Sequence, residues 1–125
     1  AMIDEALART RDNRGSTLVI ALNYGAQDEI ARATRVLAQQ AVRGEIDPTT
    51  IGPGHIAALL DTADLPPLDL LIRTSGEQRL SNFLLWQAAY AELYFTDLLW
   101  PDFDERALAD ALENFKARER RFGGL

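Results

Sequence analysis

The stretch that decides the fold is LDLLIRTSGEQRLSN, which occupies positions 68–82. Its first five residues, Leu68–Ile72, form an apolar run of strand length, and such runs suit strands that a parallel sheet buries on both faces. A turn of polar and small residues, Arg73-Thr74-Ser75-Gly76, follows at once. In open parallel sheets ligands bind beyond the carboxyl ends of the strands, so this turn is a candidate for a binding site.

Two more strands are predicted on either side of this stretch, at Thr17–Leu22 (TLVIAL) and Leu93–Thr96 (LYFT). Helical patterns separate the strands, and the predicted helices cover Ala1–Arg11, Asp28–Arg43, His55–Leu60, Phe83–Tyr90 and the residues after a capping Asp104. Strands joined by helical crossovers predict an α/β fold with a parallel sheet and flanking helices. Three strands make a narrow sheet, so the fold is predicted to be incomplete, with its missing neighbours supplied by upstream residues or by a partner.

Composition narrows the classes of function. The chain has 125 residues, no cysteine and a net charge of −6, from 13 Lys and Arg against 19 Asp and Glu. The negative balance argues against a general nucleic-acid binder, and the lack of cysteine excludes disulfides and thiolate metal sites. Neither an apolar run of about 20 residues nor a signal peptide is visible. These features favour a cytoplasmic protein.

Two arginines frame the turn after the central strand. Arg73 and Arg79 lie on either side of it, and the hydroxyl of Ser81 follows. Guanidinium groups bind phosphate oxygens in bidentate fashion, and backbone N–H groups of a Ser/Gly turn add further donors. An anion site that would suit a diphosphate is therefore predicted. The alternative is that the two arginines form ordinary surface ion pairs with Glu77 or Asp69.

Polar residues also flank the other two strands. Asn23 begins the turn that follows the first strand, and Glu92 lies at the entry of the third. A carboxylate near a diphosphate can hold Mg²⁺, and the alternative for Glu92 is a solvated residue at a strand start. His55, the only histidine, lies in a loop-to-helix stretch and is interpreted as structural.

A longer segment carries a family resemblance. Residues Asp69–Phe103, DLLIRTSGEQRLSNFLLWQAAYAELYFTDLLWPDF, resemble the most characteristic segment of the undecaprenyl diphosphate synthases, a family of cis-prenyltransferases. Ala21–Gly25 (ALNYG), with Asp28-Glu29-Ile30 after it, and the terminal Arg118–Gly124 (RERRFGG) match the same family. The resemblance covers nearly the whole chain, and it implies that residues 1–125 form the carboxyl-terminal half of a single cis-prenyltransferase domain.

The resemblance implies a parallel sheet with surrounding helices, usually in a homodimer. Members of this family are transferases that condense isopentenyl diphosphate repeatedly onto an allylic diphosphate, typically farnesyl diphosphate, with cis geometry. Their product, undecaprenyl diphosphate, carries cell-wall glycan precursors, so transient contact with a membrane surface is a further expectation. The resemblance also implies Mg²⁺ as the cofactor.

Individual site residues follow from the same resemblance. Arg73, Arg79 and Ser81 correspond to the groups that hold isopentenyl diphosphate, and Glu92 corresponds to the carboxylate that helps to place Mg²⁺. Asn23 matches the family's turn beside the site. In a separate segment, Arg121 belongs to an Arg-x-Gly tail that, in related dimers, reaches towards the diphosphate of the neighbouring subunit.

One departure from the family limits what the chain is expected to do alone. The family's first signature, a His-x-x-Met-Asp-Gly-Asn-Gly-Arg pattern, is absent from the sequence. That segment would supply the catalytic Asp and the cradle for the allylic diphosphate, so the chain by itself is expected to be inactive.

Two other interpretations of the chain remain open. One is a non-catalytic accessory subunit of a cis-prenyltransferase, and the other is a plain anion-binding α/β module. Accessory subunits tend to lose their phosphate-binding side chains, so the joint presence of Arg73, Arg79, Ser81 and Glu92 argues against the first of these.

Overall fold

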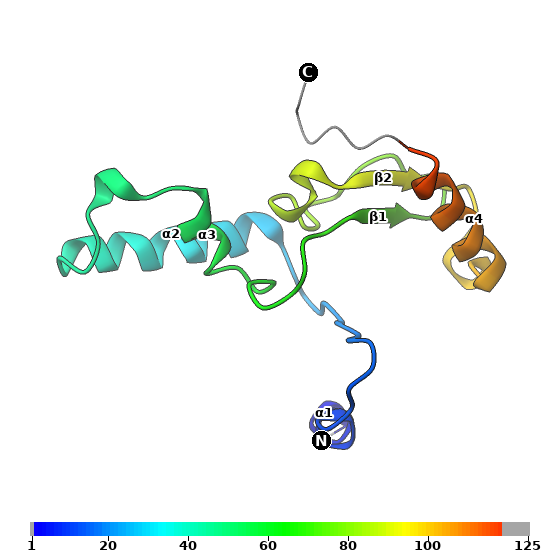
Figure 1. Ribbon diagram of the computed structural model, residues 1–125, viewed down its shortest axis with the longest axis horizontal. Helices are drawn as coiled ribbons and strands as arrows, with labels where there is room; N and C mark the ends of the chain where they lie inside the picture. The colour runs from blue at the N-terminus through cyan, green and yellow to red at the C-terminus, as the bar shows by residue number, and fades with distance from the viewer. Residues whose placement is uncertain (1, 119–125) are drawn as a thin grey trace.

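The computed structural model describes residues 2–118, and its elements follow an α/β order (Figure 1). In chain order they are α1 (Met2–Thr10), α2 (Ala26–Val42), the 3₁₀ helix η1 (Pro48–Thr50), α3 (Pro53–Ala57), β1 (Leu70–Arg73), the 3₁₀ helix η2 (Gln87–Tyr90), β2 (Glu92–Phe95), the 3₁₀ helix η3 (Trp100–Asp102) and α4 (Glu105–Lys116). The predicted first, second and last helices are confirmed, and so are the second and third strands. The short helix predicted at His55–Leu60 lies slightly earlier, as α3.

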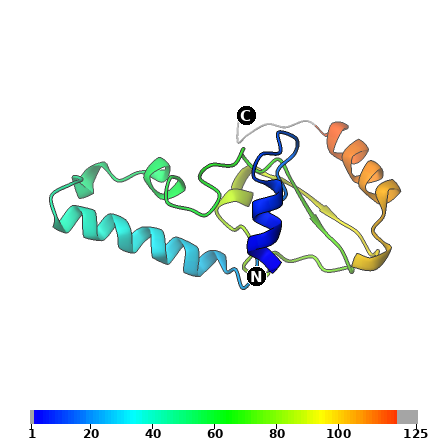
Figure 2. The ribbon, with the colours of Figure 1, turned by 90° about the horizontal axis from the view of Figure 1, so that it is seen from below.

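The two strands form a parallel pair in a register that joins Leu70 to Glu92 and Arg73 to Phe95. Both strands therefore end at the same edge of the sheet, where Arg73 is the last residue of β1. Figure 1 and Figure 2 show α2 and α3 on one side of this pair and α4 on the other. The predicted fold class, a parallel sheet with flanking helices, is confirmed.

Within residues 2–118 the core is small, because several elements bury no side chain and the others bury only a few. The buried apolar residues are Ala26, Ala33, Leu37, Leu60, Leu71, Ala107 and Ala111. Asp104 starts α4 as predicted: its carboxylate accepts a hydrogen bond from the Ala107 N–H over 2.9 Å, which satisfies a donor that the helix start leaves unpaired. No helix within residues 2–118 is long and apolar enough to cross a membrane.

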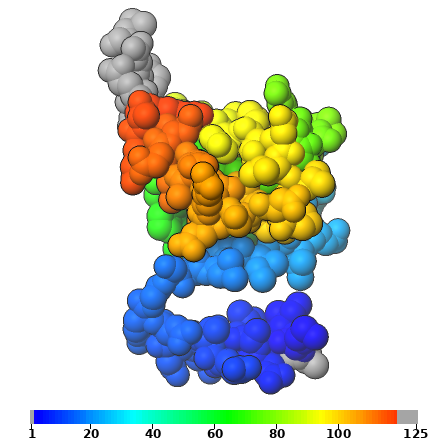
Figure 3. All heavy atoms as spheres, turned by 90° about the vertical axis from the view of Figure 1, so that its right-hand side faces the viewer, coloured from blue at the N-terminus to red at the C-terminus, as the bar shows by residue number. Residues whose placement is uncertain are grey.

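The predicted strand at Thr17–Leu22 is wrong for this structure. The segment pairs with no strand among residues 2–118, and its apolar side chains are exposed, with Leu18 at 84% and Ile20 at 70%. None of the residues of α1, which precedes it, is buried either. Figure 3 shows this amino-terminal part of the chain standing apart from the remainder. A β-branched run becomes a strand only where a neighbour pairs with its backbone, and no strand in the described part of the chain does so.

The predicted helix over Phe83–Tyr90 is also wrong. Only its last part is helical, as η2, and turns precede it. The reason is local: Ser81, Asn82 and Leu84 all have left-handed backbone, with φ of 49°, 62° and 48°. Left-handed residues cannot continue a right-handed helix, and they are costly for side chains as large as leucine.

Candidate functional site

Arg73 provides the clearest candidate for ligand binding. It closes β1, and its carbonyl accepts the Thr96 N–H over 3.0 Å, which extends the strand pairing to the carboxyl edge of the sheet. Its side chain is partly buried, yet within residues 2–118 the guanidinium has neither a hydrogen bond nor an ion pair. A partly desolvated guanidinium without a partner favours an anionic ligand, because its own charge is otherwise uncompensated.

The turn after Arg73 contributes less to an anion site than the sequence suggested. Ser75 and Gly76 both have left-handed backbone, with φ of 69° and 67°. Their N–H groups donate to the carbonyls of Leu98 and Thr96 over 2.8 and 3.0 Å, so they hold the chain that leaves β2. The expectation that this Ser/Gly turn offers its backbone donors to an anion is therefore wrong in this structure.

Arg79 forms an ordinary surface ion pair with Glu77, which was the alternative to an anion site in the sequence analysis. Its guanidinium forms an ion pair with Glu77 over 2.5 Å, and the arginine side chain is 66% exposed. An exposed pair of this kind contributes only about 0–1 kcal/mol. A multiply charged ligand can therefore replace Glu77 as the partner of Arg79 at little cost.

The turns that contain Asn23 and Ser81 come together, although they lie far apart in the sequence. The Ala26 N–H donates to the Asn82 carbonyl over 2.8 Å, and the Gln27 N–H donates to Asn82 Oδ1 over 2.9 Å. Asn23 and Ser81 are exposed and left-handed, with φ of 53° and 49°. The first N–H groups of α2 are thus capped by a side chain and a carbonyl from the second turn.

Gly25 permits this close approach. A Cβ at Gly25 would lie 2.9 Å from Asn82 Nδ2 and 3.2 Å from Asp28 Oδ2, distances at which atoms must shift. Its φ of −144° is available to any residue, so the requirement for glycine here is one of space.

Glu29, which the sequence analysis did not identify as a site residue, is a buried carboxylate next to these turns. Glu29 is 1% exposed and accepts hydrogen bonds from Tyr24 Oη over 2.5 Å, from the Asp61 N–H over 2.7 Å and from Gln87 Nε2 over 3.3 Å. Burial, first, and the hydrogen bond to Glu29, second, raise the pKa of Tyr24 to about 12. The sequence did hold a signal: Glu29 precedes the buried Ala33 by four positions, on the same face of α2.

Glu92 lies at the opposite end of the strands from Arg73. It begins β2 and is in register with Leu70, and Arg118 Nη1 donates to its Oε2 over 2.9 Å. Residues 2–118 contain no group of three or more His, Cys, Asp or Glu side chains that could hold a metal ion. Because a guanidinium already neutralises Glu92 and would repel a cation, these residues alone do not fit a magnesium site.

Arg121, the remaining predicted site residue, lies outside the described residues.

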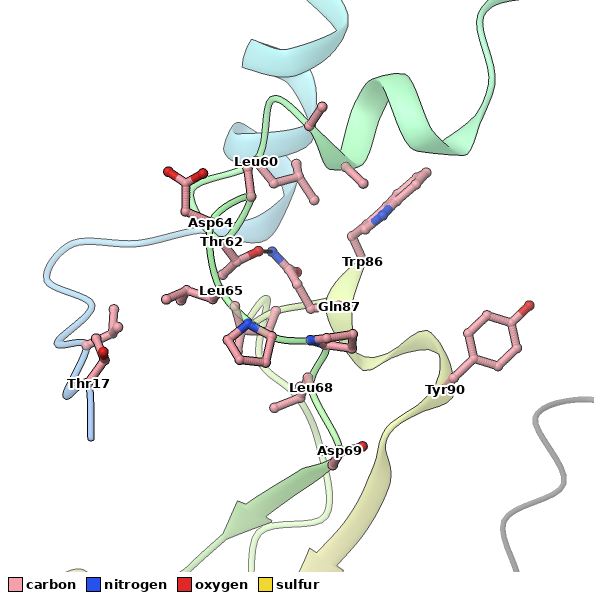
Figure 4. A pocket seen from close by; sticks show the side chains of 17 residues that line it. Thr17, Leu60, Thr62, Asp64, Leu65, Leu68, Asp69, Trp86, Gln87 and Tyr90 are labelled. Atoms are coloured by element: carbon pink, nitrogen blue, oxygen red, sulfur yellow. Dashed lines mark hydrogen bonds between the residues drawn. The ribbon is translucent and has the colours of Figure 1, made fainter. Parts of the chain in front are cut away.

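A cavity of 1090 Å³ opens at the amino end of β1, away from Arg73. Figure 4 shows Leu68 and Asp69 on the chain that leads into β1, with Trp86 and Gln87 on the segment before β2. The lining is mostly apolar: Val19, Ala57, Ala58, Leu60, Ala63, Leu65, Pro66, Pro67, Leu68, Leu84 and Trp86 all contribute to it. Cavities with this lining suit hydrocarbon groups rather than charged ones.

Comparison with known proteins gives a consistent result. Residues 1–123 match the prenyltransferase family described as undecaprenyl diphosphate synthase. The chain is 58% identical over 125 residues to an isoprenyl transferase of Zymomonas mobilis. It is 54% identical over 122 residues to a farnesyl-diphosphate-specific ditrans,polycis-undecaprenyl-diphosphate synthase of Haemophilus ducreyi. In both cases the match covers 50% of the relative, so the chain spans about half the length of the curated relatives it matches.

A solved structure shows the same likeness in three dimensions. The crystal structure of lavandulyl diphosphate synthase from Lavandula x intermedia, in complex with dimethylallyl diphosphate, superimposes with a TM-score of 0.89 at 40% sequence identity. The match covers 97% of this chain and 52% of that one.

Proposed function

Because the chain belongs to the undecaprenyl diphosphate synthase family, we propose that it forms the carboxyl-terminal half of a cis-prenyltransferase and supplies the binding site for isopentenyl diphosphate. The observation that carries this proposal is the position of Arg73, which ends β1 at the carboxyl edge of the sheet and whose guanidinium has no hydrogen bond or ion pair within residues 2–118. Ligands of open parallel sheets bind at that edge. The complementary half would supply the allylic diphosphate site and the catalytic Asp.

The proposed roles follow from what each side chain can donate. Arg73 grips diphosphate oxygens directly, and Arg79 joins it by exchanging Glu77 for the ligand. The hydroxyl of Ser81 and the amide of Asn23 belong to two turns that hydrogen bonds to Asn82 bring together, so both polar groups can serve one ligand. Holding the diphosphate in a fixed place orients the attached double bond, which is how positioning accelerates a reaction between two substrates.

In the proposed reaction, the double bond of isopentenyl diphosphate attacks the allylic carbon of the second substrate. A new carbon–carbon bond forms as the allylic carbon–oxygen bond breaks, and diphosphate leaves with the bonding electrons. The resulting cation then loses a proton to restore a double bond. Homodimer formation, the Mg²⁺ requirement, contact of the product with membrane surfaces and a cytoplasmic location remain predictions from the family resemblance.

The proposal is tested by joining two halves. The chain is co-expressed with the amino-terminal half of the Zymomonas mobilis isoprenyl transferase, and transfer from labelled isopentenyl diphosphate to farnesyl diphosphate is measured. Prenyl transfer is expected from the pair and not from the chain alone. A folded complex of the two halves without transfer would contradict the proposal and favour an accessory subunit or an anion-binding module.

Side-chain substitutions in the same pair test the assigned roles. Arg79→Ala and Ser81→Ala should each raise the KM for isopentenyl diphosphate about 10-fold or more, because a charge-assisted hydrogen bond contributes about 1.5–3 kcal/mol. The KM for farnesyl diphosphate should change little. Arg35→Ala, which removes an exposed arginine from α2, is the matched control. Unchanged kinetics in both site variants would remove these residues from the site.

A further inference from the structure

Glu29 is the largest side chain that is fully buried in the described part of the chain, and no step of the proposed reaction uses it. A buried carboxylate is unfavourable unless donors compensate its lost hydration. Among residues 2–118 no arginine or lysine forms an ion pair with it, and its partners are a phenol, a backbone amide and a side-chain amide. These donors belong to three separate segments, so one carboxylate connects parts of the chain that are distant in sequence.

The orientation of Gln87 shows how strongly Glu29 determines its surroundings. Gln87 Nε2 lies 3.3 Å from Glu29 Oε2 and 3.0 Å from Thr62 Oγ1, while Gln87 Oε1 is buried and finds no hydrogen-bond partner in the part of the chain that the structure describes. Turning the amide over would place its oxygen against the carboxylate, which is worse than leaving that oxygen unpaired. The carboxylate of Glu29 therefore determines the orientation of the Gln87 side-chain amide.

The segments that Glu29 joins are those that carry the two site turns. Tyr24, its first donor, lies between Asn23 and Gly25, and the Tyr24 ring packs edge-on against Phe83 with centroids 5.7 Å apart. Phe83 directly follows Asn82, which caps α2. Gln87 continues the same segment. Glu29 is thus hydrogen-bonded to both segments, to the segment of Asn23 through Tyr24 and to the segment of Ser81 through Gln87.

We propose that Glu29 is a positioning residue that keeps the turn of Asn23 against the turn of Ser81, so that both present their polar groups to one ligand. This inference rests on the proposed function of those turns in holding a diphosphate. It assigns Glu29 no contact with substrate and no proton transfer.

The first test is hydrogen exchange in the 125-residue chain, followed by NMR. The Ala26 and Gln27 amides donate to Asn82, so their exchange reports whether the two turns stay together. Glu29→Gln should accelerate their exchange about 10-fold or more, because the substituted amide cannot accept from the phenol, the backbone N–H and Gln87 at once. Glu45→Gln is the matched control, since Glu45 is exposed and its carboxylate forms an ion pair with Arg43 at the far end of α2.

A second variant guards against a failure of Glu29→Gln to fold. Tyr24→Phe removes one oxygen and keeps the ring against Phe83, and it should accelerate the exchange of the same two amides. Wild-type exchange at Ala26 and Gln27 in a folded variant would overturn the proposal.

Kinetics in the two-half enzyme provide a readout that a merely structural role would not move. Glu29→Gln should raise the KM for isopentenyl diphosphate with a smaller effect on kcat, whereas simple loss of folded protein lowers the apparent kcat and leaves KM unchanged. If the wild-type pair shows no prenyl transfer, the proposed function fails, and the exchange experiment still decides the role of Glu29. If the wild-type pair is active and the variant keeps its KM, the positioning role alone fails.

Discussion

Arg118 Nη1 lies 2.9 Å from Glu92 Oε2 and joins the end of α4 to the start of β2. The same nitrogen donates to the Leu93 carbonyl over 2.9 Å, and the rest of the guanidinium is held by Asn114 Oδ1. Both side chains of the pair are about two-thirds or more covered, with exposed fractions of 32% and 27%. Arg118 therefore connects the end of α4 to β2 through hydrogen bonds.

Removing the Arg118 side chain should destabilise the folded chain. Arg118→Ala leaves Glu92 and the Leu93 carbonyl without their donor, and we expect the free energy of unfolding to fall by about 1–3 kcal/mol. Urea denaturation followed by circular dichroism measures the change. Lys116→Ala is the control: it breaks an exposed pair with Glu113, with side chains 69% and 75% exposed, and should cost about 0–0.5 kcal/mol. Equal effects in the two variants would show that the Arg118 contacts do not hold α4 in solution.

The contact between Gly25 and Asn82 predicts a dependence between two substitutions. Gly25→Ala should lower the free energy of unfolding by about 1–3 kcal/mol, because the new Cβ forces Asn82 away from the start of α2. In a chain that already carries Asn82→Ala, the same change should cost much less. Gly15→Ala is the control, since no atom of the described residues lies within 4 Å of a Cβ there. Additive effects in the double variant would exclude a direct contact.

The Tyr24 phenol predicts how stability depends on alkaline pH. Its pKa is raised from 10.0 to about 12 in the folded chain, so the folded state keeps the phenol proton at a pH where the unfolded state has lost it. The stability that Tyr24 contributes is therefore complete below pH 10 and is lost as the pH rises from 10 to about 12. In denaturation curves recorded across that range, Tyr24→Phe should lose less stability than the wild type. Parallel curves for the two proteins would contradict the buried hydrogen bond to Glu29.

Two leucines test which predicted strands are part of the sheet. Leu71, in β1, is 6% exposed, and Leu71→Ala should cost about 2–5 kcal/mol of unfolding free energy. Leu18, in the Thr17–Leu22 segment, is 84% exposed, and Leu18→Ala should change the stability of the chain by no more than about 0.5 kcal/mol. Thermal or urea denaturation measures both. A loss at Leu18 as large as that at Leu71 would show that this segment is paired in solution.

The sequence was sufficient to predict a strand where the neighbouring strand lies within the same chain. Strands β1 and β2 consist mostly of apolar residues and pair with one another, so pattern and outcome agree. Thr17–Leu22 has the same pattern, but strand formation depends on a neighbour, and sequence periodicity does not report whether one is present. The helix expected after Asn82 failed because a sequence pattern did not reveal left-handed backbone at Leu84.

The sequence predicted which charged residues belong to the candidate site, but it did not predict which groups those residues contact. The arginines could be found because they follow a buried strand, yet the pairing of Arg79 with Glu77 depends on the path of the loop. The capture of the Ser75 and Gly76 amides by the chain after β2 also depends on tertiary packing. Glu29 shares a helix face with Ala33, which is a signal for burial, but the groups that cover its carboxylate, Asp61 and Gln87, are brought to it only by tertiary packing.

The most direct measurement is calorimetric titration of the 125-residue chain with isopentenyl diphosphate. One site is expected, and Arg73→Ala should weaken binding by about 10-fold or more, because it removes from the carboxyl edge of the sheet a guanidinium that no group of residues 2–118 pairs with. Arg35→Ala, the exposed control, should bind as the wild type does. Undiminished affinity in Arg73→Ala, or a folded wild-type chain that does not bind isopentenyl diphosphate, would contradict the assignment of this edge as the diphosphate site.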